Sequence, residues 1–506
     1  MRTEVISRPK YKVFQLNPAT VDHLTAIHRL HNEGEYDFWK EPSVRNASAE
    51  IMIRPDQLEE FKRYLEEATI PFRVIVEDLA KVIAEKEGPD SNRNRALRLL
   101  LADGQKDESS HSFGLAMGEY YDYDELVKFM QRVHAAMPSR TRIVSIGKTV
   151  EGREMMGIQA IRKSRGHPPA GRCGLTPGIH AREWSAVHSA MYFIQVIANA
   201  VLDNRDEVQR HVNEILKVAD IIIFPVANPD GYQYTRTDGS LVEYRMWRKN
   251  RSPQVCQELK DGRQRCCRGV DLNRNFAYKF SNIGTSFYPC SEIFHGSGAF
   301  SEPETKNIRD AVLHSDLRGR IQAFITMHAY SQLLIYPYSD RRGHYPEDVA
   351  ELKKVANQAV IAIGDKFGTF YMAGTGKSIS FHRRFSSRVR SVGPEIIYAY
   401  TGGSSDWAKE SANIKYTYTI ELRPAYTAWN GFVLAKNQLI PTARETFDGI
   451  LVIADAVVRE NPKLNDAQVS MNVVSTPAPP CADRAPSCGR CGWPNGRPSA
   501  GTPVRR

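Results

Sequence analysis

The segment "GIHAREW", residues 178–184, places His180, Arg182 and Glu183 within four positions, directly after an apolar run. Side chains three residues apart can point to the same side of one backbone turn, and zinc accepts both imidazole nitrogen and carboxylate oxygen. A metal site needs a third donor, and His328 in "MHAYSQ" offers one at the end of an expected strand, where ligands usually bind in α/β sheets. On these residues alone, a metal site, a charged strand end and a core histidine all remain open.

Glu421 is a carboxylate inside an expected buried strand, "YTYTIELR" (416–423). Side chains alternate along a strand, so Glu421 lies on the face opposite that of Tyr416 and Tyr418. A buried carboxylate is costly unless it is paired or used in chemistry. A salt bridge to Arg423 is the structural alternative to a catalytic role, although residues two apart share a strand face only loosely.

Three further motifs carry groups that could bind a substrate. Arg248 lies in "MWRKNRS", and Asn273 and Arg274 lie in "GVDLNRNF". A guanidinium binds both oxygens of a carboxylate in a planar fork, although each arginine alone is more often a surface charge. Tyr398 precedes a Gly-Gly turn in "IIYAYTGGSSDW", where a mobile aromatic ring could close over a pocket.

The first ninety residues have the element order β-α-β-β-α-β of a ferredoxin-like unit. The expected strands are 11–16, 36–39, 49–54 and 71–78, and the expected helices are 19–31 and 55–68. A further helix, 79–87, leads into the polar, basic segment 88–100. There Arg93, Arg95 and Arg98 would offer a trypsin-like protease exposed bonds. A plain interdomain linker is the alternative.

From about residue 112 to 460, apolar strand-like runs alternate with amphipathic helices. This pattern predicts an α/β domain with a largely buried sheet. The expected strands are 157–161, 173–179, 219–228, 321–328 and 416–423, and the expected helices are 123–137, 186–201, 347–367 and 442–460. The tail beyond 462 is rich in Pro, Gly and Arg, and we expect it to be disordered unless its cysteines pair.

Composition narrows the classes of protein. The chain has 506 residues, of which 42% are hydrophobic and 25% charged, values typical of a globular protein with two or more domains. No run of about 18 apolar residues is present, so we expect no membrane span. The net charge of +10 is concentrated partly in residues 377–390, which argues against a nucleic-acid partner.

The cysteines point to an oxidising compartment. Four of the eight cluster without the paired spacing of a zinc ribbon, and they are Cys256, Cys266, Cys267 and Cys290. Disulfides are therefore the better expectation. The first residues lack the apolar region of a signal peptide. We expect that this start is incomplete, with export by another route as the alternative.

Taken together, these residues resemble the zinc carboxypeptidases of the pancreatic A/B type. The resemblance rests on six motifs in family order, "HAREW", "WRKNR", "DLNRN", "HAYSQLLIYPY", "YAYTGGSSDW" and "TIELR", and covers roughly residues 10–460. It implies an activation segment that covers the active-site cleft until a trypsin-like protease cuts behind it. It also implies a disulfide between Cys267 and Cys290. A disulfide between Cys256 and Cys266 is our own inference.

The resemblance also implies a role for each motif residue. The implied ligands of a single zinc ion are His180, Glu183 and His328. The implied catalytic residues are Glu421 as general base and acid, and Arg248 as the group that polarises the scissile carbonyl. The implied clamp for the substrate's terminal carboxylate is Asn273, Arg274 and Tyr398. The implied contacts in outer subsites are Arg182, Tyr330 and Phe432. Because an internal peptide bond offers no anion to the clamp, only the last residue would be removed.

The sequence departs from the family at two places. Where the A-type has an aliphatic pocket floor and the B-type an aspartate, this chain has Ser405, with Ser339 also lining the expected pocket. We therefore expect release of neutral residues, and Tyr400 stands where small residues are usual and would narrow the space for a large aromatic. The segment 377–392 looks inserted before Tyr398. A real basic loop and retained non-coding sequence are both open.

The sequence thus predicts an α/β catalytic domain with a mixed central β-sheet flanked by helices, preceded by a small ferredoxin-like α+β activation domain. The expected boundaries are 1–87 for the activation domain, 88–111 for the linker, 112–462 for the catalytic domain and 463–506 for the tail. The predicted function is a secreted, monomeric zinc exopeptidase, made as a zymogen, that acts on peptide or protein C-termini. The alternative is a non-catalytic, zinc-bound extracellular matrix or binding protein on this fold. Such a protein would be expected to have lost a catalytic residue or a ligand, and none is lost.

Overall fold

The structure is a computed structural model that describes residues 10–41, 47–88, 113–161, 171–258, 262, 264–314, 320–376 and 399–460. Within these residues the strands form a four-stranded sheet, an eight-stranded sheet and a two-stranded hairpin. Most of the expected linker 88–111, the insert 377–392, Tyr398 and the tail 463–506 lie outside the described residues.

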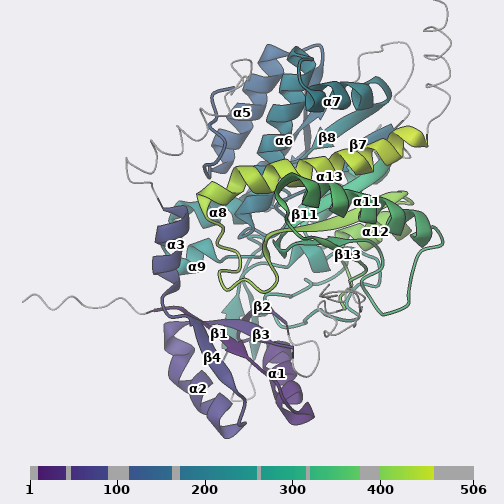
Figure 1. Cartoon of the computed structure of the whole chain (residues 1–506). Coiled ribbons are helices and arrows are strands. Elements are labelled where there is room, and N and C mark those ends of the chain that lie inside the picture. Colours follow the sequence, from purple (N-terminus) through teal and green to yellow (C-terminus); the bar gives the residue numbers. More distant parts are fainter. Residues whose placement is uncertain are drawn as a thin grey trace, which may run out of the picture. The chain divides into compact units, whose positions relative to one another are not determined.

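The N-terminal domain has the predicted element order (Figure 1). Its elements are β1 (Lys12–Leu16), α1 (Val21–Glu33), β2 (Asp37–Lys40), β3 (Ala49–Ile53), a 3₁₀ turn (Pro55–Gln57), α2 (Leu58–Glu67), β4 (Phe72–Val76) and α3 (Leu79–Glu87). The strands pair antiparallel in the order β2-β3-β1-β4. Helix α1 begins where Thr20 accepts a hydrogen bond from the His23 amide, and it ends at Gly34 with a left-handed φ of 68°. Phe14, Ile27 and Phe61 are fully buried in the core of this domain.

The second domain, which the sequence predicts to be catalytic, is built on a mixed eight-stranded sheet. Its strands are β5 (Thr141–Lys148), β6 (Glu154–Ala160), β7 (Gly171–Leu175), β8 (Ala219–Ile223), β11 (Ile321–Ser331), β12 (Leu333–Ile335), β13 (Met372–Gly374) and β14 (Tyr416–Ala425). The order is β13-β12-β14-β11-β7-β8-β6-β5. The central strands β14, β11, β7 and β8 run parallel. Their carboxyl ends therefore meet at one edge of the sheet, where α/β proteins bind ligands.

Helices cover both faces of this sheet. The helices are α5 (Tyr123–Ala136), α6 (Trp184–Leu202), α7 (Glu207–Val218), α8 (Pro229–Thr237), α9 (Val242–Arg245), α10 (Pro303–His314), α11 (Val349–Phe367), α12 (Ser404–Glu410) and α13 (Leu439–Arg459). Figure 1 shows α13 running across the sheet beside α6 and α11. Alternate strand residues feed two cores: Ile325 and Met327 pack with α6 and α13, and Phe324 packs with α10 and α12. This alternation follows from the period of two along a strand.

All five strands and four helices predicted for the catalytic domain are present, with shifted ends. Strands β7 and β8 end earlier than expected, because Pro177 and Pro225 follow two residues later and cannot donate to the ladder. Strand β11 runs three residues beyond His328. Among the described residues, one helix, α6, is long and apolar enough to cross a bilayer, and the fold buries 72% of that window.

The clustered cysteines form the two expected disulfides, Cys256–Cys266 and Cys267–Cys290. The first joins β9 (Val255–Glu258) to β10 (Gln264–Cys267), which pair as an antiparallel hairpin. Cys173 is buried and not disulfide-bonded.

Candidate active site

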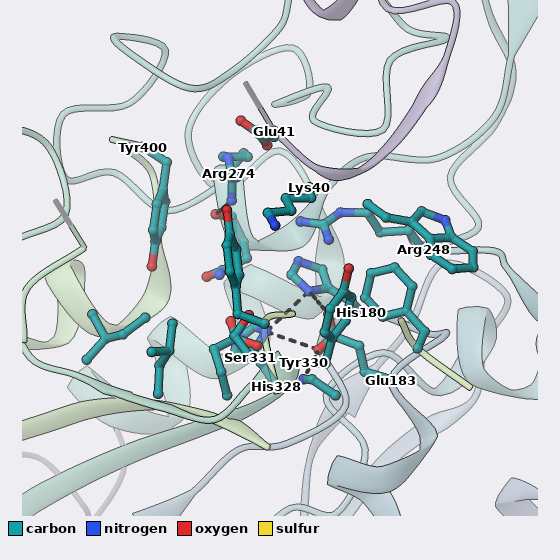
Figure 2. Close-up of a pocket in the computed structure, with 18 residues that line it drawn as sticks. Lys40, Glu41, His180, Glu183, Arg248, Arg274, His328, Tyr330, Ser331 and Tyr400 are labelled. Carbon is teal, nitrogen blue, oxygen red and sulfur yellow. Dashed lines mark hydrogen bonds and ion pairs between the residues drawn. The ribbon is translucent and has the colours of Figure 1, made fainter. Parts of the chain in front are cut away.

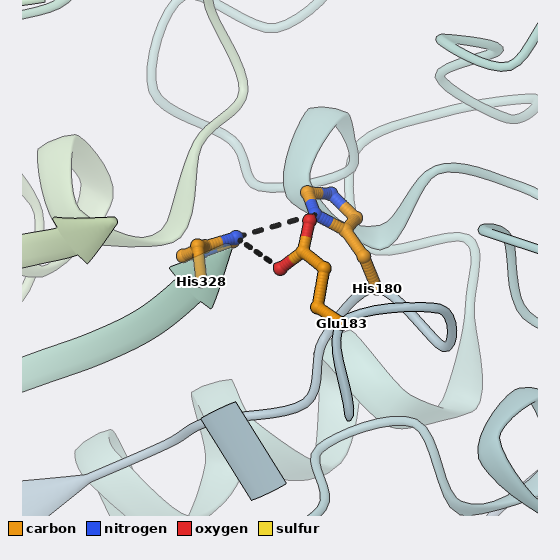
Figure 3. A group of neighbouring side chains, drawn as sticks. All are labelled: His180, Glu183 and His328. Carbon is orange, nitrogen blue, oxygen red and sulfur yellow. Dashed lines mark hydrogen bonds and ion pairs between the residues drawn. The ribbon is translucent and has the colours of Figure 1, made fainter. Parts of the chain in front are cut away.

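The three expected metal ligands converge at the carboxyl end of the central strands (Figure 3). His180 and Glu183 lie in the turn between β7 and α6, and His328 lies on the neighbouring β11. Glu183 Oε1 lies 2.7 Å from His180 Nδ1, and Oε2 lies 3.1 Å from His328 Nδ1. All three side chains are buried, with their ligand atoms within 4.8 Å of one another. Two imidazoles and one carboxylate match the protein ligands of a catalytic zinc site, which leaves a fourth position open.

The electrostatics of this group favour a cation. Burial raises the pKa of the Glu183 carboxyl, but the two adjacent histidines outweigh it and hold that pKa well below its usual range. Burial lowers the pKa of His180. Burial acts in the same direction on His328, but the Glu183 carboxylate outweighs it and the pKa of His328 is raised. An entering cation would therefore compete with a proton for the His328 ring.

Asp271 is a site residue that the sequence reasoning missed. It is fully buried, and its Oδ1 accepts hydrogen bonds from His180 Nε2 at 3.1 Å and from the Asn273 amide at 3.0 Å. Its Oδ2 accepts from Arg248 Nη2 at 2.9 Å. Burial raises the pKa of this carboxyl, but Arg248 and His180 outweigh it and keep the pKa well below its usual range. Asp271 thus orients His180 Nδ1 towards the other ligands and fixes the Arg248 guanidinium.

Glu421 projects from β14 beside the metal-ligand group. The sheet register pairs it with His328 on β11, and it lines the same cavity. Tyr416 and Tyr418 are buried on the opposite face, as the alternation predicted. Arg423 is not its partner, since Arg423 Nε donates to Glu445 Oε1 at 2.7 Å. Burial raises the pKa of Glu421 to about 8.

The expected carboxylate clamp lies on the 3₁₀ turn Leu272–Arg274. Asn273 Oδ1 accepts a hydrogen bond from the Ser404 amide at 3.0 Å, and Arg274 Nε donates to the Gly284 carbonyl at 2.7 Å. These bonds fix both side chains at the cavity wall. The third expected member, Tyr398, lies outside the described residues.

Most of the expected site residues within the described chain line one cavity (Figure 2): His180, Glu183, Arg248, Asn273, Arg274, His328, Tyr330, Glu421 and Phe432. Trp39, Lys40 and Glu41 of the N-terminal domain line it as well. The remaining volume is about 100 Å³, well below the roughly 300–1,000 Å³ of typical ligand pockets. With the N-terminal domain in place, the cavity is therefore too small for a peptide substrate.

The residues expected in outer subsites contact the N-terminal domain directly. Arg182 Nη1 donates to Asp37 Oδ2 at 2.7 Å. Tyr330 donates from its hydroxyl to Glu50 Oε2 at 3.3 Å. The ring of Phe432 lies against Trp39, with centroids 5.4 Å apart.

The two serines expected at the pocket floor do not reach this cavity. Ser339 is 0% exposed and Ser405 is 4% exposed. Ser405 Oγ accepts a hydrogen bond from Thr419 Oγ1 at 3.0 Å, which turns it towards the sheet. Among the residues expected near the pocket floor, Tyr400 lines the cavity instead. Sequence position alone could not reveal this, because the backbone course decides which neighbour faces the cavity.

Comparisons with known proteins agree with this geometry. Residues 126–449 match the family model described as zinc carboxypeptidase, and residues 14–86 match the carboxypeptidase activation peptide. Carboxypeptidase A2 of Mus musculus is 31% identical over 453 residues, covering 89% of this chain and 94% of that protein. Carboxypeptidase B of Astacus astacus is 34% identical over 339 residues, covering 67% of this chain and 97% of that protein.

The solved structures give the same picture. The crystal structure of thrombin activatable fibrinolysis inhibitor matches with a TM-score of 0.70 and 27% identity, over 89% of this chain and 99% of that chain. Carboxypeptidase A from Helicoverpa armigera matches with a TM-score of 0.68 and 24% identity, over 89% and 98%. At that identity the second match supports the fold alone. The His-Glu-His group, the activation domain and the two family matches together establish that the chain belongs to the zinc carboxypeptidase family and is a metallopeptidase made with an activation peptide.

Proposed function

We propose that this zinc carboxypeptidase releases single neutral residues from the C-termini of peptides once its activation domain has been removed. The observation that carries the proposal is one cavity lined by the His-Glu-His group, Glu421, Arg248 and the Asn273–Arg274 pair. A metal group, a general base and an anion clamp in one cavity are the parts that exopeptidase chemistry requires.

The metal site would be held by His180, Glu183 and His328. When bound there, zinc supplies a Lewis acid that polarises a carbonyl and makes hydroxide available near neutral pH. Asp271 would hold His180 in the orientation needed for binding, through the 3.1 Å hydrogen bond to Nε2.

The proton transfers would fall to Glu421. Its carboxylate would take a proton from the attacking water and deliver it to the nitrogen of the leaving amino acid. Burial raises the pKa of this carboxyl, which makes its carboxylate a stronger base. Arg248, fixed by Asp271 at 2.9 Å, would face the negative charge that grows on the carbonyl oxygen in the transition state. It should therefore affect turnover more than binding.

Asn273 and Arg274 would bind the free terminal carboxylate and so restrict cleavage to the last peptide bond, with Tyr398 as the third member of the clamp. Arg182, Tyr330 and Phe432 would bind residues further from the C-terminus. A neutral preference is supported by Tyr400, which lines the cavity beside Arg274 and carries no charge that would recognise a basic or an acidic side chain.

We also propose that a trypsin-like protease activates the enzyme by cutting within 88–111, between an activation domain at 1–87 and a catalytic domain at 112–462. The contacts from Asp37 and Glu50 to Arg182 and Tyr330 support a domain that occupies the substrate cleft before the cut. Two disulfides support an extracellular, secreted enzyme. We further propose that it acts as a monomer.

The test is release of C-terminal residues by the zinc-loaded full chain before and after limited trypsin treatment. Blocked dipeptides ending in Phe, Leu, Ser, Arg and Glu form the panel, and His180→Ala is the metal-site control. We expect activity that arises on cutting, disappears with a chelator and favours neutral residues. Equal release of Arg would refute the neutral preference. No release from the cut, zinc-loaded protein would favour the non-catalytic alternative.

A further inference from the structure

The segment 399–403 carries an aromatic ring into the cavity beside the carboxylate clamp. Figure 2 shows Tyr400 on one side of the cavity and Arg248 on the other. The Tyr400 ring lies over the Arg274 guanidinium, with 4.5 Å between Arg274 Cζ and the ring centroid. Tyr400 is only 6% exposed. An aromatic ring therefore stands next to the group that would bind the substrate's terminal carboxylate.

The backbone that carries this ring is fixed by hydrogen bonds. The Tyr400 amide donates to the Ser339 carbonyl at 3.0 Å, the next amide donates to the Ile283 carbonyl at 2.9 Å, and the Gly402 amide donates to the Tyr278 carbonyl at 3.1 Å. Because three consecutive amides are hydrogen-bonded to other segments of the domain, the backbone can move the ring out of the cavity only by breaking these bonds.

Two glycines, Gly284 and Gly403, pack closely against Tyr400. A Cβ at Gly403 would lie 2.6 Å from Tyr400 Cε2, and a Cβ at Gly284 would lie 2.9 Å from Tyr400 Cβ. Real Cβ atoms essentially never come this close to another heavy atom. The Tyr400 ring therefore fills the space that a larger residue would need at position 403, and the backbone that carries the ring fills it at position 284. Protein interiors resist such overlap, because an added group forces side chains off their preferred rotamers or shifts the backbone. The ring is therefore a packed wall of the pocket.

The polar residues behind the ring are buried in the fold, where the backbone or side chain of each makes at least one hydrogen bond. Ser405 accepts a hydrogen bond from Thr419, and the Ser339 amide donates to Asp406 Oδ2 at 2.8 Å. None of these four polar residues lines the cavity that holds Arg274 and Tyr400. A substrate side chain entering beside the clamp would meet the phenol ring before it reached them.

We propose that Tyr400 is the specificity-determining residue of this enzyme, because its ring closes the pocket beside Arg274 and limits the released residue to a small neutral one such as Ala or Ser. The inference rests on the proposed function and narrows its substrate class. Large aromatic and long aliphatic side chains are excluded by the ring, whose own position is held by the flanking glycines.

The size of the effect follows from pocket discrimination. One methylene more or less in an apolar pocket changes kcat/KM by roughly 10- to 200-fold. A benzyl group exceeds a methyl group by a whole ring, so we expect at least about 100-fold preference for a substrate ending in Ala over one ending in Phe.

The experiment compares trypsin-treated full chains of the wild type, Tyr400→Ala and Tyr400→Phe on blocked dipeptides ending in Ala and in Phe. In the wild type we expect kcat/KM to favour Ala at least about 100-fold. Tyr400→Ala should raise the ratio of kcat/KM for the Phe substrate to kcat/KM for the Ala substrate at least about 100-fold. Tyr400→Phe keeps the ring and should keep the wild-type preference, which separates the ring from its hydroxyl.

The outcomes distinguish this inference from the function on which it rests. Wild-type enzyme that releases Phe as readily as Ala would overturn the role of Tyr400 and leave the zinc exopeptidase intact. An Ala preference that survives in a folded Tyr400→Ala, as judged by its melting temperature, would overturn the role of Tyr400 as well. If that variant fails to fold, the inference is tested by the other two proteins. Both the wild type and Tyr400→Phe must then favour the Ala substrate at least about 100-fold. Absence of zinc-dependent release from every substrate would overturn the proposed function, and this inference with it.

Discussion

A buried ion pair attaches the activation domain to the catalytic domain and offers a direct test of latency. Glu87, the last residue of α3, accepts hydrogen bonds from Arg245 Nε at 2.6 Å and from Nη2 at 2.7 Å. The side chains are 2% and 0% exposed, respectively. Arg245 also donates to the Arg182 and Phe432 carbonyls at 2.7 and 3.1 Å. The pair thus joins the end of the activation domain to two backbone carbonyls beside the cleft.

The change to make is Glu87→Ala. Removing one partner of a buried pair leaves a buried charge without compensation and costs about 3–5 kcal/mol. That cost falls on the closed arrangement alone, because water solvates Arg245 once the domain moves away. At about 1.4 kcal/mol per factor of ten, the balance between covered and open cleft shifts by roughly 100- to 5,000-fold. Activity of the uncut protein should rise by that factor, up to the limit set by the trypsin-cut enzyme.

The assay measures release of a C-terminal residue by uncut protein, as a fraction of the activity of the same sample after trypsin. Glu85→Ala is the matched control, because Glu85 lies on the same helix, its side chain is 57% exposed and it pairs only loosely with Lys81 at 3.8 Å. We expect it to remain latent. If uncut Glu87→Ala releases the C-terminal residue no faster than the uncut control, this ion pair does not keep the activation domain over the cleft.

Three further predictions concern single carboxylates. Glu421→Gln should lower kcat by about 10²- to 10⁴-fold while metal analysis finds zinc retained, since Glu421 is not in the ligand group; loss of zinc would contradict its assignment. Asp271→Asn should weaken zinc binding about 10- to 100-fold in chelator competition, because His180 loses a charged acceptor, and unchanged affinity would show that this bond is dispensable. Burial raises the pKa of Asp406 from 3.8 to about 7, so the folded protein binds this proton more tightly and loses stability as pH rises between those values. The free energy of unfolding of Asp406→Asn should therefore exceed that of the wild type by nothing near pH 4 and by about 4 kcal/mol above pH 7. Urea denaturation of both proteins across this pH range measures the difference. A difference that does not grow with pH would contradict the cost of the buried charge.

The strength of local signals decided which elements could be predicted. All six elements of the ferredoxin-like unit were predicted, since each has clear alternation or helical spacing, and α1 has a capping residue in Thr20. Helix α7 is an exception, because it was missed although it has a capping box at Asp206 and Gln209. Strand β5, helix α10 and the three-residue strands β12 and β13 were missed as well. These elements are polar, short or at an edge of the sheet. Pairing and packing with distant partners define them, and a local pattern carries little of that information.

The candidate site divides in the same way. The His-Glu-His group, Arg248 and Glu421 were predicted from motifs, and the structure brings them to one cavity. Asp271 was missed, because one aspartate in a polar segment looks like any surface acid until folding brings it to His180, 91 residues away. Ser405 was expected at the pocket floor, but the ring of Tyr400 lines the cavity. Residue order cannot say which of two neighbours faces a cavity.

The sequence by itself determined the family and the activation domain of this protein, and it supplied the residues that we propose as metal ligands, acid–base carboxylate and anion clamp. Those features reside in residue identity and short-range spacing, which need no knowledge of the fold. The tertiary structure decided the distances and what stands between the groups. It placed Glu421 opposite His328 through the register of two parallel strands, paired Glu87 of α3 with Arg245 in a buried ion pair and set a tyrosine beside Arg274. Each of these depends on pairing or packing between segments far apart in the chain, and burial alone then fixes which charges and shapes a substrate meets.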